Sequence, residues 1–235
     1  MFALGEFVRW EGAAMAGLRE RQRRAREDAI LSAALRLFRD EGYGQARMER
    51  IAEEAEVSVG TLYNYHQNKA AILGALVHRE VETVLENGAA IVADPPSDVH
   101  EALNVLMRNY AGHALEDMTA EMWRTAIGNT IADPASAFAK AYEDLDERII
   151  AQMTEVLSSL VERGRVREDV DLPSFGQLLF DIMDRRFIRH VTMPDDSEAA
   201  MFADLDHANA LFARAIAPAI AERPQVAVPA LSAAE

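Results

Sequence analysis

Apolar residues recur at helical spacing along almost the whole chain. Ile30, Ala34, Leu37 and Phe38 are one, three or four residues apart, as on one face of a helix, and similar stripes return in later segments. Runs that alternate apolar and polar residues, which are typical of strands, are scarce. The pattern predicts an all-α fold of about nine helices.

The N-terminal part of this pattern predicts a small domain. Its helices are expected at about 25–40, 46–55 and 58–65, and a longer fourth helix at about 69–92 leads out of it. Ser58 is a suitable N-cap, because its hydroxyl can accept a hydrogen bond from a backbone N–H two or three residues on. Two short helices joined by a tight turn form either an ordinary α-hairpin or a DNA-binding helix-turn-helix.

The remaining pattern predicts a larger helical domain over residues 71–220. Its helices are expected to begin near Ser97, Thr119, Asp133, Pro173 and Ser197. The start at Asp133 is predicted from an N-cap Asp followed by Pro134 at the first helical position. The last two helices, 173–192 and 196–218, carry apolar stripes suited to a four-helix bundle with a second copy of the chain. Residues 221–235, rich in Ala and Pro, are expected to be a frayed tail.

Residues 1–24 are expected to be a disordered or basic arm ahead of a DNA-binding domain at 25–70. Charged residues interrupt the apolar run that a secretory leader would need. We expect residues 1–14 to be disordered or to derive from an upstream start codon, which a packed Trp10 would contradict. A basic run follows, suited either to DNA phosphates or a minor groove, or to a solvated helix start. Its members are Arg19, Arg21, Arg23, Arg24 and Arg26.

Composition and charge narrow the function classes. The chain has no cysteine, which excludes disulfides, zinc–thiolate sites and iron–sulfur clusters. No run approaches the roughly 18 uncharged apolar residues of a membrane span, so no membrane partner and a cytoplasmic location are expected. The net charge of −15 opposes nucleic-acid binding, but residues 1–69 carry 11 basic and 11 acidic residues. The excess acid therefore lies in residues 70–235, away from the basic run.

The short third helix has an unusual surface for an acidic protein, because its outward positions carry no acid. With its neighbours it forms the row Gly42-Tyr43, Met48, Ile51-Ala52, Ala55, Val57-Ser58, Gly60-Thr61-Leu62-Tyr63, Tyr65 and Lys69. This row resembles the DNA-binding domain of the tetracycline-repressor (TetR) family over about residues 26–72. Three positions depart from the family pattern: Ala46 replaces Thr, Glu56 replaces Gly, and His66 replaces Phe.

The resemblance implies that the third helix enters the major groove of operator DNA. Tyrosine hydroxyls, Arg47 and Lys69 are then expected to hold phosphates, while Asn64 pairs with adenine and Val59 or Thr61 meets a thymine methyl. His66 either donates to guanine or packs where the family has Phe. The expected DNA-binding residues are Arg47, Ser58, Val59, Gly60, Thr61, Tyr63, Asn64, Tyr65, His66 and Lys69.

The resemblance also implies that the larger domain dimerises and holds a small-molecule inducer. Large side chains expected around the inducer, or alternatively in plain core, are Tyr110, Trp123, Tyr142, Phe180 and Met183. A cluster of arginines could meet an anionic effector, form a solvated face or make salt bridges across the dimer; its members are Arg185, Arg186 and Arg189. The acidic bias of the domain instead suits a cationic ligand. The helix that begins at Lys69 is the expected lever between inducer and DNA.

The sequence therefore predicts a homodimeric repressor that binds a palindromic operator and is released by a small-molecule inducer. An enzyme is disfavoured, since the chain has no Gly-rich phosphate loop and Asp204-x-x-His207 occurs once where a di-iron bundle uses a comparable spacing twice. No catalytic residue, metal site or cofactor is expected. The alternative is a helical adaptor of the same fold that has lost DNA binding.

Overall fold

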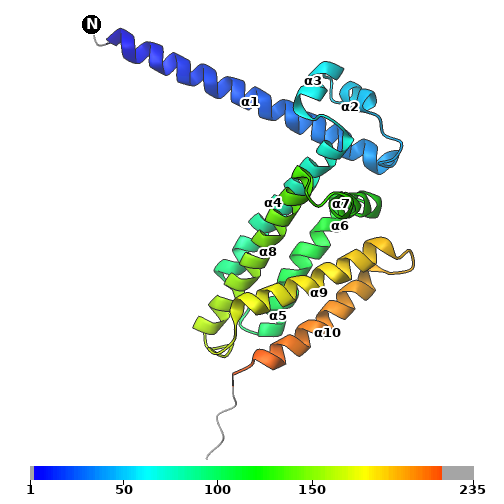
Figure 1. Cartoon of the computed structure of the whole chain (residues 1–235). Coiled ribbons are helices and arrows are strands. Elements are labelled where there is room, and N and C mark those ends of the chain that lie inside the picture. The colour runs from blue at the N-terminus through cyan, green and yellow to red at the C-terminus, as the bar shows by residue number, and fades with distance from the viewer. Residues whose placement is uncertain (1–2, 219–235) are drawn as a thin grey trace, which may run out of the picture.

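The computed structural model describes the backbone of residues 3–218 and the side chains of residues 17–218, and this part of the chain is all-α. The small domain at one end of the molecule consists of three helices (Figure 1). They are α1 (Ala3–Asp40), α2 (Met48–Glu54) and α3 (Val59–Tyr65). The long helix α4 (Lys69–Ala93) leads from this domain into the larger one.

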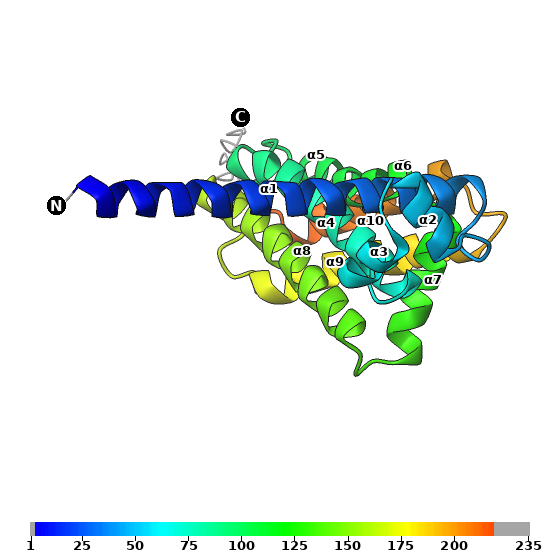
Figure 2. The same ribbon diagram turned by 90° about the horizontal axis from the view of Figure 1, so that it is seen from above.

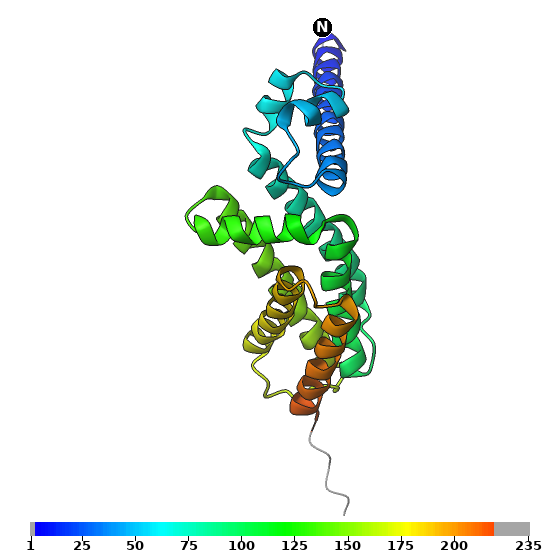
Figure 3. The same ribbon diagram turned by 90° about the vertical axis from the view of Figure 1, so that its right-hand side faces the viewer.

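The larger domain is built around α8 (Ala137–Glu162), which packs on α4 and on α9 (Leu172–Thr192). Its remaining elements are α5 (Val99–Met107), the π-helical turn η1 (Arg108–Gly112), α6 (His113–Asp117), α7 (Ala120–Ala132) and α10 (Glu198–Ile216). Figure 3 shows α7 lying across the molecule between the two domains. Because α5, η1 and α6 follow one another without a break, they count as one segment, and the described residues form nine helical segments. The structure thus confirms the prediction of an all-α fold with about nine helices.

Side-chain caps explain where most helices begin. At the N-caps Ser58, Asn68, Asp98, Thr119, Ser136, Asp171 and Ser197, the side chain accepts a hydrogen bond from the backbone N–H three residues on. Each bond satisfies one of the N–H groups that the first turn of a helix leaves unpaired. The starts expected from Ser58, Thr119, Pro173 and Ser197 are thereby confirmed. The cap expected at Ser97 is wrong by one residue, because the carboxylate of Asp98 caps α5.

The predicted helix start at Asp133 is wrong. Asp133 instead ends α7, and its carbonyl accepts hydrogen bonds from the backbone N–H and the hydroxyl of Ser136. Ser136 Oγ in turn accepts from Ala139 N at 3.0 Å and caps α8. The Asp-Pro pair therefore lies in the turn between two helices, since the later serine provides the better cap.

The first helix is much longer than predicted. The expected arm at 1–24 is helical from Ala3, and α1 reaches past the rest of the small domain as a rod (Figure 2). No proline interrupts residues 1–40, and Glu20 pairs with Arg23 and Arg24 one turn away. Opposite charges one turn apart lie side by side on a helix and favour the helical conformation. The Trp10 side chain and the predicted tail at 221–235 lie outside the described residues.

Two further properties of the described chain bear on its function. None of its helices combines the length and the apolarity needed to cross a membrane. Within residues 17–218, no three or more His, Asp or Glu side chains gather as metal ligands would.

Candidate functional site

The helix α3 presents a short polar face to solvent. Val59 and Tyr63 are 40% and 45% exposed, and Asn64 is exposed beside them, so these three side chains are free to approach DNA. On the opposite side, Leu62 is completely buried and anchors the helix. The predicted outward residues Val59, Tyr63 and Asn64 therefore share one accessible surface.

The first turn of α3 is fixed by its own hydroxyl groups. Ser58 Oγ accepts a hydrogen bond from Thr61 N at 3.0 Å and lies 2.7 Å from Thr61 Oγ1. The bond between the two hydroxyls uses only one of their two O–H groups. The other O–H, the methyl group of Thr61 and the exposed Gly60 backbone are the parts of this turn that can meet DNA.

Two predicted DNA-binding residues point inward. His66 is only 6% exposed, and burial lowers the pKa of its imidazole, so the ring is neutral at pH 7. Of the two alternatives for His66, the structure has the ring packed in the core, where the family has Phe, and not exposed to donate to guanine. Its Nε2 atom has no hydrogen-bond partner among the described residues. Tyr65 is half-buried, and its hydroxyl donates to the carbonyl of Arg23 at 3.3 Å. Tyr65 therefore joins α3 to α1 in this structure.

Lys69 lies at the start of α4 and ties it to the loop before α2. Its ammonium donates to the carbonyl oxygens of Tyr43, Gly44 and Ala46 at 2.5, 3.1 and 3.0 Å, and lies 4.5 Å from the centre of the Tyr43 ring. Desolvation lowers the pKa of this amine. Because an ammonium has three N–H donors, none remains here for a phosphate. Arg47, by contrast, is exposed at the N-cap of α2.

The other two departures from the family pattern have different consequences. Ala46 is buried and precedes the N-cap of α2, which is Arg47, so the missing threonine hydroxyl removes no cap at residue 46. Glu56 adopts φ 54°, a left-handed conformation that glycine tolerates better. Its N–H bonds to Glu53 O and that of Val57 to Ala52 O, which is the Schellman ending of a helix.

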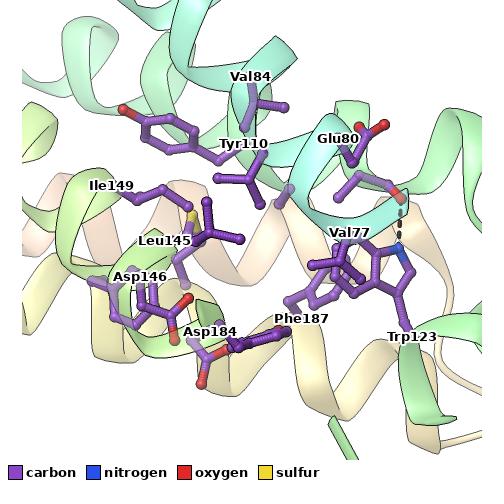
Figure 4. A pocket seen from close by; sticks show the side chains of 16 residues that line it. Val77, Glu80, Val84, Tyr110, Trp123, Leu145, Asp146, Ile149, Asp184 and Phe187 are labelled. Carbon is purple, nitrogen blue, oxygen red and sulfur yellow. Dashed lines mark hydrogen bonds between the residues drawn. The ribbon is translucent and has the colours of Figure 1, made fainter. Parts of the chain in front are cut away.

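A cavity lies in the larger domain between α4, η1, α6, α7, α8 and α9 (Figure 4). It is small, with a volume of about 60 Å³, and is lined by all five side chains predicted around an inducer, Tyr110, Trp123, Tyr142, Phe180 and Met183. Tyr110 donates to Gln152 Oε1 at 2.5 Å, and the indole N–H of Trp123 donates to Ala114 O at 2.6 Å. The structure thus brings the five residues together, and their role as ligand contacts stays a prediction.

Three acids that the sequence analysis missed also line this cavity. Glu80 on α4 accepts from His113 Nδ1 at 2.9 Å, while burial raises the pKa of its carboxyl. Burial and the neighbouring Asp184 raise the pKa of Asp146 to about 7. The signal was present in the sequence, because Asp146 and Asp184 each follow a predicted lining aromatic by one helical turn.

The arginine cluster of α9 does not line the cavity. Arg186 is nearly buried and binds Asp196 at 3.0 Å and Asp204 at 2.6 Å, and Arg189 lies 3.5 Å from Asp196. These ion pairs hold the connection between α9 and α10. This intrachain structural role of Arg186 and Arg189 is none of the three predicted alternatives.

Comparison with known proteins agrees with this architecture. Residues 30–76 match the family model described as "Bacterial regulatory proteins, tetR family". The chain is 20% identical over 167 residues to the fatty acid metabolism regulator protein of Bacillus subtilis (strain 168), with 70% of this chain and 82% of that protein covered. Its N-terminal part is 39% identical over 69 residues to the HTH-type transcriptional repressor KstR of Rhodococcus jostii (strain RHA1), covering 29% and 31% of the two chains.

A similar fold is found in a solved repressor. FadR of Thermus thermophilus, a TetR-family transcriptional repressor crystallised with lauroyl-CoA, has a TM-score of 0.63 and 24% identity, over 84% of this chain and 98% of FadR. Residues 30–76 are therefore similar to the tetR family of bacterial regulatory proteins, and the chain shares its fold with a TetR-family repressor.

Proposed function

We propose that this protein is a cytoplasmic repressor that binds a palindromic operator as a homodimer and is released by a small molecule held in the cavity. The observation that carries the proposal is the course of α4. Its first residue, Lys69, is bonded to the loop of the DNA-binding domain, and its middle forms one wall of the cavity. The relatives named above are regulators rather than enzymes, which supports the same class.

The connection through α4 is short. Val77 and Val84 line the cavity eight and fifteen residues after Lys69, or about 12 and 22 Å along a helix. A ligand that shifts this wall would therefore move the anchored end of α4 as one rigid element. A typical coupling of about 1–3 kcal/mol would weaken DNA binding by roughly 5- to 150-fold.

The packing of α4 on α8 makes its position sensitive to the cavity. Gly74 lies so close to Phe138 that a Cβ atom at residue 74 would be 2.8 Å from Phe138 Cδ2. Closely packed interfaces of this kind move between discrete arrangements rather than deforming continuously. This contact lies between the anchored end of α4 and the cavity, where a shift of the helix would have to pass.

On the DNA side, the exposed surface of α3 supplies both kinds of contact. Asn64 is suited to pair with adenine, Val59 and the Thr61 methyl to meet thymine methyls, and Tyr63 and Arg47 to hold phosphates. Such a short helix covers few base pairs. Two copies that read half-sites about one helical turn apart would give the missing affinity and specificity.

We place the dimer contact on α9 and α10. Leu178 on α9 and Leu211 on α10 are 46% and 51% exposed, and Phe175 packs edge-on against Phe212 at a centroid distance of 6.0 Å. Exposed leucines beside partly exposed aromatics are suited to an apolar interface between copies. Replacing both leucines with Glu is expected to yield monomers in equilibrium sedimentation.

The function is tested by selection from a random DNA duplex pool at roughly physiological salt, followed by sequencing of the retained duplexes. Enrichment of a two-fold palindrome with half-sites about one turn apart is expected. A matched selection with the L178E/L211E variant should lose the palindrome. If the wild-type protein, unfolded and refolded to remove any carried ligand, enriches nothing above a salt-sensitive background, the adaptor alternative replaces the repressor.

A further inference from the structure

The cavity wall carries charges of one sign only. Among the 16 side chains that line it, Glu80, Asp146 and Asp184 are acidic, and none is Lys, Arg or His. The remaining lining residues are aromatic or aliphatic apart from the phenol groups of two tyrosines. A ligand in this cavity would therefore meet an apolar surface with a negative potential.

The two aspartates lie at one end of the cavity, on the facing helices α8 and α9 (Figure 4). Neither makes a hydrogen bond or an ion pair with any other described residue, whereas Glu80 is paired with His113 at 2.9 Å. Burial, followed by repulsion from Asp184 and Glu143, raises the pKa of Asp146. Burial and Asp181 raise the pKa of Asp184, an effect that the exposed Arg185 partly offsets. Two like charges at an apolar wall are costly without a positive partner.

Aromatic side chains complete a site for such a partner. Tyr142 and Phe180 each precede one of the aspartates by one helical turn, and Trp123 packs edge-on against Phe187 at 5.2 Å between ring centres. A cation is attracted to aromatic faces as well as to carboxylates, while an alkyl or aryl group packs on the same rings.

We propose that the cavity binds an organic cation with an apolar body, its ammonium group between Asp146 and Asp184 and its body against the wall that includes Trp123 and Phe187. This inference rests on the proposed function as a ligand-responsive repressor and names the class of its effector. An acyl thioester of coenzyme A is disfavoured, because its phosphates are anionic and no basic side chain lines the cavity.

The test compares two probes of the same shape that differ in charge, phenyltrimethylammonium and tert-butylbenzene. Binding is followed by the fluorescence of Trp123 in a Trp10→Phe protein, which removes the other tryptophan. The cation is expected to bind roughly tenfold or more tightly than the neutral probe. In the D146N/D184N variant this ratio should fall to about one, whereas Asp144→Asn, an exposed carboxyl on α8, should keep the ratio.

The pH dependence gives a second readout of the same proposal. Cation binding is expected to tighten by roughly tenfold between about pH 6 and pH 8, as the aspartate pair ionises. The charged groups that face the pair are Glu143 on α8, Asp181 and Arg185 on α9, and the Glu80–His113 pair across the cavity. The D146N/D184N variant should lose most of this dependence, which separates the pair from Glu80 and His113.

The outcomes separate the ligand class from the repressor function. A ratio near one in the wild-type protein, no binding of phenyl-, hexyl- or decyltrimethylammonium up to millimolar concentration, or tighter binding of lauroyl-CoA than of any cation overturns the cation proposal. Release of the selected palindrome by another ligand would then leave the repressor function standing. Cation binding that depends on the aspartates supports the proposal even if no operator is found, in which case only the repressor function fails.

Discussion

Replacing Asp146 with Asn is expected to stabilise the protein at alkaline pH. The carboxyl lines the cavity without a partner, and burial raises its pKa from 3.8 to about 7 in the folded state. Since the folded pKa lies above the unfolded one, the neutral form is favoured by folding. Stability from this group is fully present below about pH 4 and is lost as the pH rises towards 7. An asparagine has the same shape but does not ionise, so the variant does not lose this stability as the pH rises.

The magnitude follows from the shift. About three pKa units correspond to an upper bound of about 4 kcal/mol, of which the interval from about pH 5 to pH 8 contains somewhat more than half. The side chain keeps partial contact with solvent, so screening reduces the expected change to ~1–2 kcal/mol. The advantage of the Asp146→Asn variant over wild type should therefore grow by ~1–2 kcal/mol between these two pH values.

The assay is urea unfolding followed by far-ultraviolet circular dichroism, at a fixed protein concentration because a dimer would make stability concentration-dependent. Asp144→Asn, on the exposed side of the same helix, is the control and should follow wild type. A variant curve that runs parallel to wild type from about pH 5 to pH 8 would refute the reasoning, since Asp146 would then be ionised at no cost.

Three further predictions concern the DNA-binding domain. Glu56→Gly should stabilise the protein by ~0.5–1 kcal/mol in urea unfolding, because relief of the left-handed strain exceeds the entropy cost of glycine. The control Glu53→Gly, inside α2, should destabilise the protein, and destabilisation by both variants would contradict the strain argument. Lys69→Met should lower the free energy of unfolding by ~1–2 kcal/mol and weaken DNA binding without changing the slope of log affinity against log salt concentration. Arg47→Ala should reduce that slope by about one. A reduced slope for Lys69→Met would show that the Lys69 ammonium moves to a phosphate on DNA. Asn64→Ala should relax the sequence preference at one base pair by ~1–3 kcal/mol in a duplex selection, whereas His66→Phe should leave that preference unchanged. His66→Phe should also raise the free energy of unfolding, most of all below about pH 6.5, because the unfolded state then protonates the imidazole more readily than the folded state does. A changed base preference in His66→Phe would show that the ring contacts DNA.

The elements could be predicted from the sequence where local chemistry decides them. Ser58 and Ser197 cap helices through bonds to residues only three positions away, so their roles are visible in the chain itself. The same reasoning failed at Asp133, where two local signals compete and only the geometry of the turn selects Ser136. The length of α1 was missed because its first residues were interpreted as a disordered segment and residues 19–26 as a basic arm, although ion pairs one turn apart stabilise the helix.

The directions of the side chains that follow the short helix α3 were harder to predict than the helix itself. His66 and Lys69 were both counted among the DNA-binding residues, yet the first is buried and the second bonds three carbonyl groups of a loop more than twenty residues earlier. Such contacts depend on tertiary packing that no local pattern contains. The cavity residues were easier, since large side chains at helical spacing converge wherever helices surround one space.

The π-helical turn η1 gives the cavity a means of changing its specificity. One extra residue per turn is accommodated at Arg108–Gly112, and this turn places both Tyr110 and Ala111 at the cavity wall. Deleting a single residue here would restore an ordinary α-helix and leave α6 nearly unrotated relative to α5, because the wide turn accommodates one residue more than an α-helical turn does. A one-residue deletion would thus exchange the tyrosine for a different side chain at the wall while the other lining residues stay in place. Relatives of this protein can therefore diverge in ligand by a change of length rather than of composition.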